Sequence, residues 1–489
     1  MLSAIISREF FSNILNLRFI VGVILCVIIT IACVMVLTHD YQQEMADYNL
    51  RINLQDEFLS KYAHTNRMGG MITPQKPPEQ FRPLIIGIPR EANLGSFDDN
   101  PLPVLFPPLD FLFIVTIIMS LLAMLFSYDA ITRERQRGTL RLVISNSIPR
   151  AKILLGKWIG GTGSLLIPFI LSLLAGALYI SINPAIQWDG SAWAEFSLLI
   201  AASVTFISLF YLLGLMVSTF SRYSSTSILT CLFLWVLLIL VIPNMCPFIS
   251  AQLYRIPSVN KIERQVNHLL DTERDELGRE FSREVLKKFA ARYGKLFSEF
   301  ESLEFGGLWG RCSPENRKAT QQRASVDPQF RAMIDAFREQ LNQAWSEANR
   351  IQREKAEQLR KDLTTKATAQ TKIAKNLACI SPYANYIYLA TDLTGTGLRS
   401  LDYSKQIASE YYNMFYSYLG KKEQQAMKDD PTFDENSFLD ISDRPRFVFK
   451  EEPLRDKLNA VLPYWGILVL FNVVFFVVAF AGFMRYDVR

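Results

Sequence analysis

The types and the spacing of the reactive residues in this 489-residue chain match no known catalytic pattern. Gly156 and Lys157 are followed by Trp158, and the glycine-rich stretch 160–164 has no lysine, so the sequence contains no nucleotide-binding phosphate loop. The protease pattern HExxH and the hydrolase pattern GxSxG are also absent. None of the three histidines, His39, His64 and His268, has a second type of ligand at the spacing typical of a metal site. We therefore expect no enzymatic activity, no metal site and no cofactor bound by this chain itself.

The six cysteines fall into two groups. Four lie in or at the end of apolar segments, where a thiol behaves as a small apolar side chain: Cys26, Cys33, Cys231 and Cys246. The other two, Cys312 and Cys379, lie in a segment that we place outside the membrane, where oxidation is permitted. They could form one disulfide or remain two separate thiols, and a spacing of two lone cysteines does not decide between these alternatives.

Apolar residues make up half of the composition and are concentrated in nearly uncharged segments. Each segment reaches the roughly 20 residues that a helix needs to cross a bilayer. Hydropathy predicts six membrane-spanning helices: 19–38, 109–128, 158–181, 195–220, 225–248 and 462–484. The net charge of +5 is too small over this length to indicate a nucleic-acid-binding protein. The sequence thus predicts an all-α polytopic membrane protein.

The distribution of basic residues predicts the orientation of these spans. The loop 129–157 contains only two acids, Asp129 and Glu134. Its basic residues are Arg133, Arg135, Arg137, Arg141, Arg150, Lys152 and Lys157. Basic loops face the cytoplasm, so the loop 129–157 is expected there. Because successive spans alternate in direction and there are six of them, both termini are expected on the same side. The segment 182–193, which has no Lys or Arg, is expected outside. We predict a multi-pass protein of the inner, or cytoplasmic, membrane with its large domain outside or periplasmic.

The first 18 residues precede the first span and form an amphipathic pattern. Apolar side chains recur every three or four positions: Leu2, Ile5, Ile6, Phe10, Ile14 and Leu17. This pattern predicts an interfacial helix in the headgroup layer. The alternative is a plain cytoplasmic extension of the span 19–38, which we expect to be a retained anchor rather than a cleaved signal peptide.

The first of two long segments predicted outside the membrane is 39–108. Its helical part is expected at 41–62, as a continuation of the first span. Many prolines toward its end disfavour long helices there. The apolar run from Leu84 to Ile88 predicts a short strand.

The second segment, 249–461, contains two long helical patterns. Apolar residues keep a three-or-four spacing over 259–303. A glycine-rich break and a polar connector follow, and a second pattern runs from Asp327 to about residue 377, with Asp327 as N-cap and Pro328 in the first helical position. Helices of this length span about 65–70 Å, so the patterns predict an elongated, coiled-coil-like hairpin. A compact bundle of shorter helices is the alternative.

The basic loop 129–157 contains the most informative pattern. A break at Gly138 precedes a short amphipathic segment in which Leu140, Val143 and Ile144 share one face, and a turn follows at Pro149. Such a helix could lie on the membrane or enter a groove of a partner protein. The alternative interpretation is a solvated basic loop without a partner.

The order of residues in this loop resembles the signature of type-2 ABC exporter permeases. In that family the loop is the coupling helix that docks onto an ATPase subunit. The residues that match the pattern are Glu134, Arg137, Gly138, Thr139, Leu140, Ser145, Pro149, Arg150 and Lys157. Two other pieces, Ser381-Pro382 followed by 393–397 and the ending 485–489, resemble the branch with a large extracytoplasmic insertion between the last two spans.

The resemblance implies a division of labour between subunits. Two permease chains, identical or different, would form the translocation unit in the lipid bilayer. A separate cytoplasmic ABC ATPase would bind ATP and Mg and supply the power stroke. The helical hairpin would then be a handle for a periplasmic or extracellular partner, or a solvated surface, and no nucleic acid is expected as a partner.

These expectations divide the chain into six parts. They are an interfacial helix 1–18, the first span 19–38, an extracytoplasmic loop 39–108, spans two to five in 109–248 with the coupling loop 129–157, a large extracytoplasmic helical domain 249–461, and the sixth span with a short cytoplasmic tail, 462–489. One alternative is a membrane-anchored structural or assembly protein that works through its coiled-coil region. A membrane-linked enzyme is disfavoured because the spans lack catalytic polar clusters.

Overall fold

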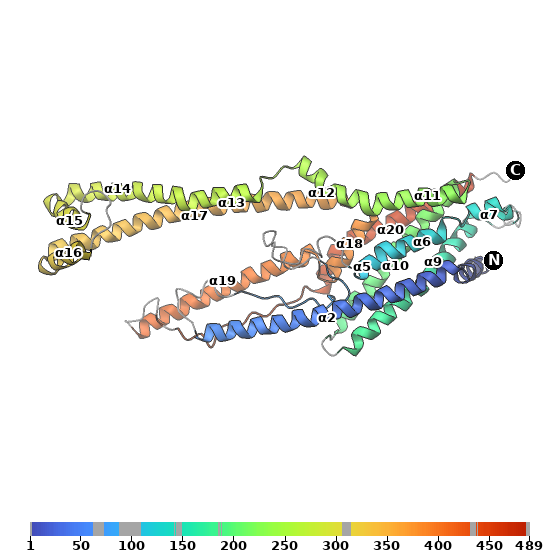
Figure 1. Cartoon of the computed structure of the whole chain (residues 1–489), viewed down its shortest axis with the longest axis horizontal. Coiled ribbons are helices and arrows are strands. Elements are labelled where there is room, and N and C mark those ends of the chain that lie inside the picture. The colour runs from blue at the N-terminus through green and yellow to red at the C-terminus, as the bar shows by residue number, and fades with distance from the viewer. Residues whose placement is uncertain are drawn as a thin grey trace. The chain divides into compact units, whose positions relative to one another are not determined.

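The regular elements of the computed structural model are all helices over the residues that it describes. Those residues are 2–61, 73–87, 109–140, 142, 149–183, 186, 188–305, 314–430, 437 and 439–485. Figure 1 shows the course of the chain. The predicted all-α class is confirmed.

Six of the helical segments are long and apolar enough to cross a membrane, which confirms the six predicted spans. They are α2 (Leu17–Lys61); α5, η1 and α6 (Phe111–Phe113, Ile114–Met119 and Ser120–Ser127), followed by α7 (Thr132–Gln136); α9 (Arg150–Ile182); α10 (Gly190–Phe220); α11, η2 and α12 (Ser224–Trp235, Val236–Val241 and Ile242–Leu253); and α20 (Leu454–Met484). The elements η1 and η2 are π-helical turns. Helix α2 continues beyond the first span to Lys61, as the sequence predicts.

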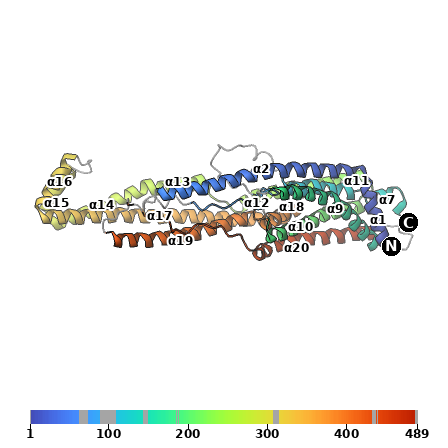
Figure 2. The ribbon, with the colours of Figure 1, turned by 90° about the horizontal axis from the view of Figure 1, so that it is seen from below.

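The chain divides into two compact units, residues 1–245 with 378–489 and residues 246–377. Helix α10 is at the centre of the first unit, where residues 206–215 are all buried. It packs against α6, α9, α20 and the short helix α18 (Pro382–Leu393) (Figure 2). The sides of the other spans that face away from this core expose many large apolar residues, as expected of helices that contact lipid.

Helix α1 (Leu2–Ile14) is separated from α2 by a turn at Leu15 and Asn16. It runs in a different direction from α2 in both views, so it is not a straight extension of the first span (Figures 1 and 2). It packs on the first half of α9, where glycines at 156 and 160 let the two helices approach closely. Its predicted place in the headgroup layer stays a prediction.

The predicted strand from Leu84 to Ile88 is wrong over the part that the structure describes. Phe81 to Leu84 form a turn in which the carbonyl of Phe81 accepts from the N–H groups of Leu84 and Ile85. The apolar side chains of this turn are buried against the spans rather than alternating between two faces. An apolar run therefore fills the core as a turn, and no neighbouring strand pairs with it in residues 73–87.

The second unit contains the two predicted helical patterns. It comprises the last residues of α12, followed by α13 (Val259–His268), η3 (Leu269–Glu273), α14 (Arg274–Tyr293), α15 (Lys295–Phe305), α16 (Pro314–Val326) and nearly all of α17 (Pro328–Ala378). Helices α13 and α14 lie alongside α17, joined by two apolar clusters (Figure 1). Helix α17 has 51 residues, about 75 Å, which agrees with the elongated hairpin rather than a bundle of short helices.

Two details of this hairpin differ from the prediction. The first helical pattern does not continue to residue 303, because α14 ends at Tyr293 and Gly294 adopts a positive φ of 49°. The segment predicted as a polar connector contains helix α16. The predicted start of the second pattern is confirmed, since Asp327 Oδ1 accepts from the N–H groups of Gln329 and Phe330 at 2.9 and 3.3 Å.

Candidate functional site

The end of α6 is bonded to the start of α2. Arg18 donates through its guanidinium to the carbonyl of Leu125 at 3.1 Å and to the hydroxyl of Tyr128 at 2.9 Å. The guanidinium also lies over the ring of Tyr128, 5.2 Å from its centre. Because the last carbonyls of a helix have no partner within the helix, a cation at this position stabilises the helix end. Arg18 thereby fixes the first and second spans to each other.

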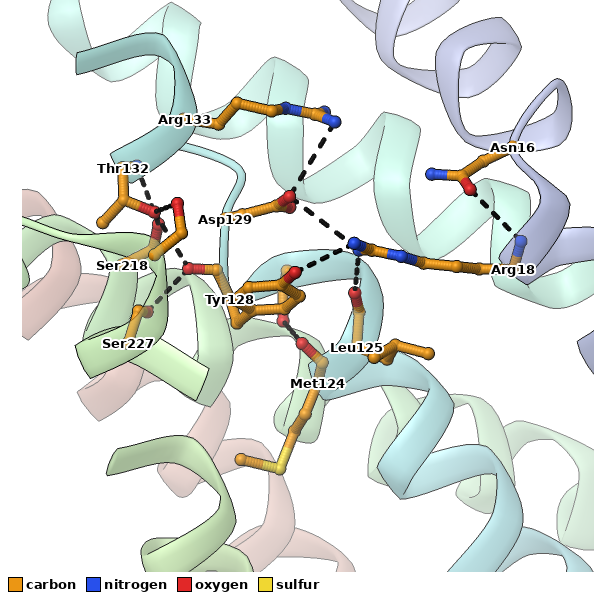
Figure 3. A network of polar contacts seen from close by, with 12 residues as sticks. Asn16, Arg18, Met124, Leu125, Tyr128, Asp129, Thr132, Arg133, Ser218 and Ser227 are labelled. Carbon is orange, nitrogen blue, oxygen red and sulfur yellow. Dashed lines mark hydrogen bonds and ion pairs between the residues drawn. The ribbon is translucent and has the colours of Figure 1, made fainter. Parts of the chain in front are cut away.

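The turn between α6 and α7, residues 128–131, is held by two more helices. Ser218 of α10 accepts through Oγ from the N–H groups of Ile131 and Thr132 at 3.0 and 3.1 Å, and so caps the start of α7. Ser227 of α11 donates to the carbonyl of Tyr128 at 2.6 Å. Figure 3 shows these contacts converging on the turn, which we call the α6–α7 junction. The junction is therefore bonded to α2, α10 and α11.

A buried carboxylate lies inside this junction. Asp129 is almost fully buried, and its Oδ2 lies 3.8 Å from the guanidinium nitrogens of both Arg18 and Arg133 (Figure 3). A buried carboxylate needs compensating positive charge, and here α2 and α7 each supply one arginine. The charge of Asp129 thus connects α2 with α7.

The most buried charge of the site is Lys157, on α9. Its side chain is only 3% exposed, and Nζ lies 2.7 Å from Oε1 of Glu9 and 2.9 Å from Oε1 of Glu134. Glu9 comes from α1 and Glu134 from α7, so one ammonium group connects three helices. Removing one member of such a buried group leaves an uncompensated charge, which makes the arrangement strongly position-determining.

Glycines on α9 allow this close arrangement. A Cβ at Gly160 would lie 2.7 Å from the carbonyl oxygen of Ile6 on α1, and one at Gly161 would overlap the hydroxyl of Tyr211 on α10. A Cβ at Gly163 would instead make an ordinary contact of 3.8 Å with Phe10. Gly160 and Gly161 are thus required because α1 and α10 lie so close to α9 at these positions, whereas Gly163 is not required for this reason.

The structure brings together three of the nine residues predicted from the loop pattern, Glu134, Thr139 and Lys157. Thr139 donates to the carbonyl of Glu134 at 3.3 Å. Arg150 donates to the carbonyls of Phe483 and Met484 at 3.2 and 2.7 Å, at the end of α20. Glu134 therefore contacts both Thr139 and Lys157, whereas Arg150 connects the loop to the end of α20.

The remaining predicted residues of the loop separate into exposed and buried positions. Arg137 and Gly138 are exposed, and Gly138 has a φ of 71°, which favours glycine. Leu140 is completely buried in the core of the first unit, so in this structure its side chain is not available to a partner. Pro149 directly precedes α9. Ser145 lies outside the described residues, as do 141, 143, 144 and 146–148.

Sequence reasoning missed Glu9, Arg18 and Ser218. Glu9 is the only acid among the first 39 residues, and Lys157 directly precedes a segment without charges. A lone acid on an amphipathic helix and a lone base at the start of a span form a detectable signal, because each would otherwise be buried without compensation. Nothing in the sequence distinguishes Ser218 from the other serines of the spans.

The segment 381–397, noticed from its sequence pattern, packs into the core of the first unit. Ser381 donates to the carbonyl of Leu238 in the π-helical turn η2, at 2.5 Å, and Tyr386 is bonded to Ser203 of α10 at 2.7 Å. A Cβ at Gly87 would overlap Thr396. These contacts indicate a structural role. The structure does not decide between a Cys312–Cys379 disulfide and two separate thiols, because Cys312 lies outside the described residues.

An apolar pocket of about 560 Å³ lies between α2, η1 with α6, and α11. Its lining includes Val21, Leu122 and Trp235, with Arg18 as the only charged residue of the lining. Such a pocket suits an apolar molecule or chain rather than an ion or a sugar. The three helices that form its walls are those that Arg18 and Ser227 bond to the α6–α7 junction.

Comparison with known proteins places these features in a family. The sequence model described as "ABC-2 family transporter protein" matches residues 3–488, nearly the whole chain. A probable ABC transporter permease protein, NosY, from Stutzerimonas stutzeri is 36% identical over 69 residues, which cover 14% of this chain and 25% of that protein. The similarity to this relative thus spans a quarter of its length.

Proposed function

The chain belongs to the ABC-2 family of transporter proteins, and on that premise we propose that it is the permease subunit of an ATP-driven exporter. The subunit works as a pair with a second permease chain, identical or different. It has no enzymatic activity of its own. ATP and Mg are bound by a separate ABC ATPase on the cytoplasmic side.

In this proposal the segment from Arg137 to Pro149 receives the movement of the ATPase. The observation that carries the proposal is the burial of Lys157 between Glu9 and Glu134. Because this lysine and the α6–α7 junction connect α7 to α1, α2, α9, α10 and α11, a displacement of α7 has to move those helices with it. Membership of the family implies that an ATPase acts on this loop. The hydrogen bonds and ion pairs of α7 would pass the movement on to the other helices.

The apolar pocket is the place where we propose that cargo meets this chain. Its walls, α2, α6 and α11, are bonded to one another at the junction by Arg18 and Ser227. A change in their packing would change the shape of the pocket. The lining supports an apolar cargo, or a cargo with an apolar portion.

The orientation completes the proposal. Both termini and the loop 129–157 face the cytoplasm, and 39–108 and 249–461 face the outside of the inner membrane. The excess of basic residues in the loop supports this orientation. A membrane anchor for an assembly protein is the less favoured function. An anchor requires only one or two spans, and it does not require a junction that bonds several spans to one another.

Co-purification with a separate ABC ATPase tests the proposal. Gly138→Pro and Leu140→Asp both alter the loop, but Leu140 is buried, so Leu140→Asp would also disturb folding. Arg137→Glu is the sharper probe, since Arg137 is exposed and its reversal leaves the core intact. We expect Arg137→Glu to weaken ATPase retention roughly tenfold, as expected for one charged contact at an interface.

The matched control is Lys405→Glu, which reverses an exposed charge on α19 (Leu398–Asp429). It should retain the ATPase fully. ATPase binding that survives Arg137→Glu and Gly138→Pro together would contradict the coupling role of the loop. Labelling of a cysteine at position 137 by an impermeant reagent added outside intact cells would contradict the orientation.

A further inference from the structure

The second unit distributes its charge unevenly along the hairpin. Residues 251–268 and 353–377, which we call the hairpin base, contain ten Lys and Arg against four Asp and Glu. The intervening residues 269–352 contain 14 Lys and Arg and 14 Asp and Glu. All of the excess positive charge of the hairpin therefore lies in its base, next to the end of α12.

The cations of the hairpin base are directed to solvent. Nine of the ten are exposed: Arg255, Lys261, Arg264, Arg353, Lys355, Arg360, Lys361, Lys366 and Lys372. None of these nine forms an ion pair with another described residue. One of the four acids, Glu354, is already paired with Arg350 at 2.8 Å. Over the described residues, the excess positive charge of the hairpin base is therefore not neutralised by ion pairs.

Contacts inside the second unit fix the level of the hairpin base relative to the end of the fifth span. The span runs from Ser224 to Leu253, about 45 Å, which equals a bilayer with its headgroup layers. Ser250 donates to the carbonyl of Gln370 at 2.7 Å, and Gln370 donates to the carbonyl of Tyr254 at 2.8 Å. Position 370 of α17 therefore lies at the level where the span ends.

Three of the exposed cations are close to that level. Arg255 directly follows Tyr254, and at 1.5 Å per residue Lys372 and Lys366 lie about 3 and 6 Å along the helix from Gln370. All three are within about 8 Å, the distance over which charges interact at physiological ionic strength. A surface at the headgroup level thus falls within their electrostatic reach.

The chemistry of the hairpin base favours a charged rather than an apolar partner. Its apolar side chains Ile262, Val266 and Ala356 are buried between α13 and α17. Leu253, at the end of the span, is the only large apolar side chain that is strongly exposed in the described residues of the base. A protein interface ordinarily needs a buried apolar or aromatic centre, which is missing here.

From this arrangement we propose that the hairpin base binds the headgroups of anionic phospholipids on the membrane face where the fifth span ends. Lysine and arginine side chains close to an anionic leaflet are attracted to its phosphate groups and released by salt. The proposal requires that the fifth span crosses the membrane. It requires neither the ATPase nor a particular orientation, so it can fail or succeed independently of the proposed function.

Photolabelling of the full chain in lipid nanodiscs tests this binding. The probes are phosphatidylglycerol and phosphatidylcholine that carry the same photoreactive group in the headgroup, and labelled peptides are mapped by mass spectrometry. We expect phosphatidylglycerol to label peptides from 251–268 and 353–377 several-fold more than phosphatidylcholine does. High salt should remove this preference in the unmodified chain.

Two triple variants with equal charge change provide the comparison. Arg255→Glu, Lys366→Glu and Lys372→Glu reverse the charges nearest the span end. Lys287→Glu, Lys288→Glu and Lys295→Glu reverse three exposed charges in the neutral part of the hairpin. We expect a roughly tenfold loss of phosphatidylglycerol labelling in the first variant and no change in the second.

Three results would overturn the proposal: equal labelling of the hairpin base by both lipids, a preference that persists in high salt, or an equal loss in both variants. ATPase retention is measured on the same samples. Loss of ATPase binding by the Arg137→Glu chain with unchanged lipid labelling would support only the coupling role. The triple variant Arg255→Glu, Lys366→Glu and Lys372→Glu should lose lipid labelling and retain the ATPase.

Discussion

Lys157 and the lysines of the hairpin base have the same side chain in opposite environments. Lys157 is buried and lies within 3 Å of two carboxylates, whereas Lys366 and Lys372 are exposed and form no ion pair with a described residue. A buried charge needs its partners in place and so fixes the helices that carry them, while an exposed charge stays available to a ligand. The comparison teaches that burial, rather than residue type, separates a positioning role from a recognition role in this chain.

Removing the buried charge should have the largest effect. Lys157→Met leaves Glu9 and Glu134 without their cation, and we expect the free energy of unfolding to fall by about 3–5 kcal/mol. Thermal unfolding in nanodiscs, followed by circular dichroism, measures the change. The combined variant Glu9→Leu, Glu134→Leu and Lys157→Met should recover most of the stability, because apolar side chains replace the whole group. An unchanged unfolding temperature for Lys157→Met alone would show that the lysine is not held between carboxylates.

Helix approach at α9 gives the second-largest expected effect. In Gly160→Ala the new methyl group meets the backbone carbonyl of Ile6, and we expect a loss of about 1–3 kcal/mol in the free energy of unfolding. Gly163→Ala is the matched control, since its methyl group has room against Phe10. That variant should be neutral or slightly stabilising, because alanine is the better helix former. Equal losses in both variants would mean that helix α1 does not pack on Gly160.

In the hairpin the effects should be smaller, and a pair of aspartates separates capping from surface charge. Asp327→Ala removes the N-cap of α17 and should cost about 1 kcal/mol. Asp335→Ala removes only an exposed ion pair with Arg331, at 3.9 Å, and should change stability by less than about 0.5 kcal/mol. Hydrogen exchange of the first turns of α17 reports both changes. Equal protection in both variants would contradict the capping assignment.

The smallest effect concerns an exposed carboxylate in the first unit. The hydrogen bond from Tyr418 at 2.5 Å and the ion pair with Lys422 at 2.9 Å hold the pKa of Asp443 below its ordinary value of 3.8. A carboxylate with a lowered pKa adds stability above its ordinary pKa and loses it as the pH falls through the lowered value. Tyr418→Phe removes the larger cause, so we expect residues 439–447 to loosen at a higher pH than in the unmodified chain.

Hydrogen exchange over residues 439–447 across a series of acidic pH values measures this shift. The matched control is Tyr416→Phe, which changes an exposed tyrosine two positions earlier on α19. Identical pH profiles for Tyr418→Phe and the unmodified chain would show that the hydrogen bond does not affect Asp443.

Much of the fold could be predicted because membrane spans and capped helices depend on local sequence. The six spans follow from apolar length, since a bilayer requires backbone groups to be bonded within the helix. The start of α17 follows from Asp327 and Pro328. The break at Gly294 could not be seen, because Leu296, Phe297 and Phe300 continue the three-or-four spacing across it and then pack back onto the same cluster. Periodicity reports a buried face and does not report a change of direction.

The candidate site could be predicted only in part. Spacing within one loop identifies Glu134 and Lys157, but the third member of their group, Glu9, lies 148 residues before Lys157 in the chain. The apolar pattern of α1 predicts an interfacial helix but does not show that Ile5 and Ile6 of this helix lie against glycines of α9. A contact between distant segments needs a three-dimensional arrangement that neither segment specifies alone.

The burial of α18 has a consequence for the order in which the protein is made. Tyr386, Leu389 and Leu393 complete the interior of the first unit, yet they follow the entire second unit in the chain. During translation the first 245 residues must therefore remain incompletely packed until residues 246–377 have left the ribosome. Until α18 has been synthesised, the apolar surface that it covers has to be shielded by lipid or by chaperones.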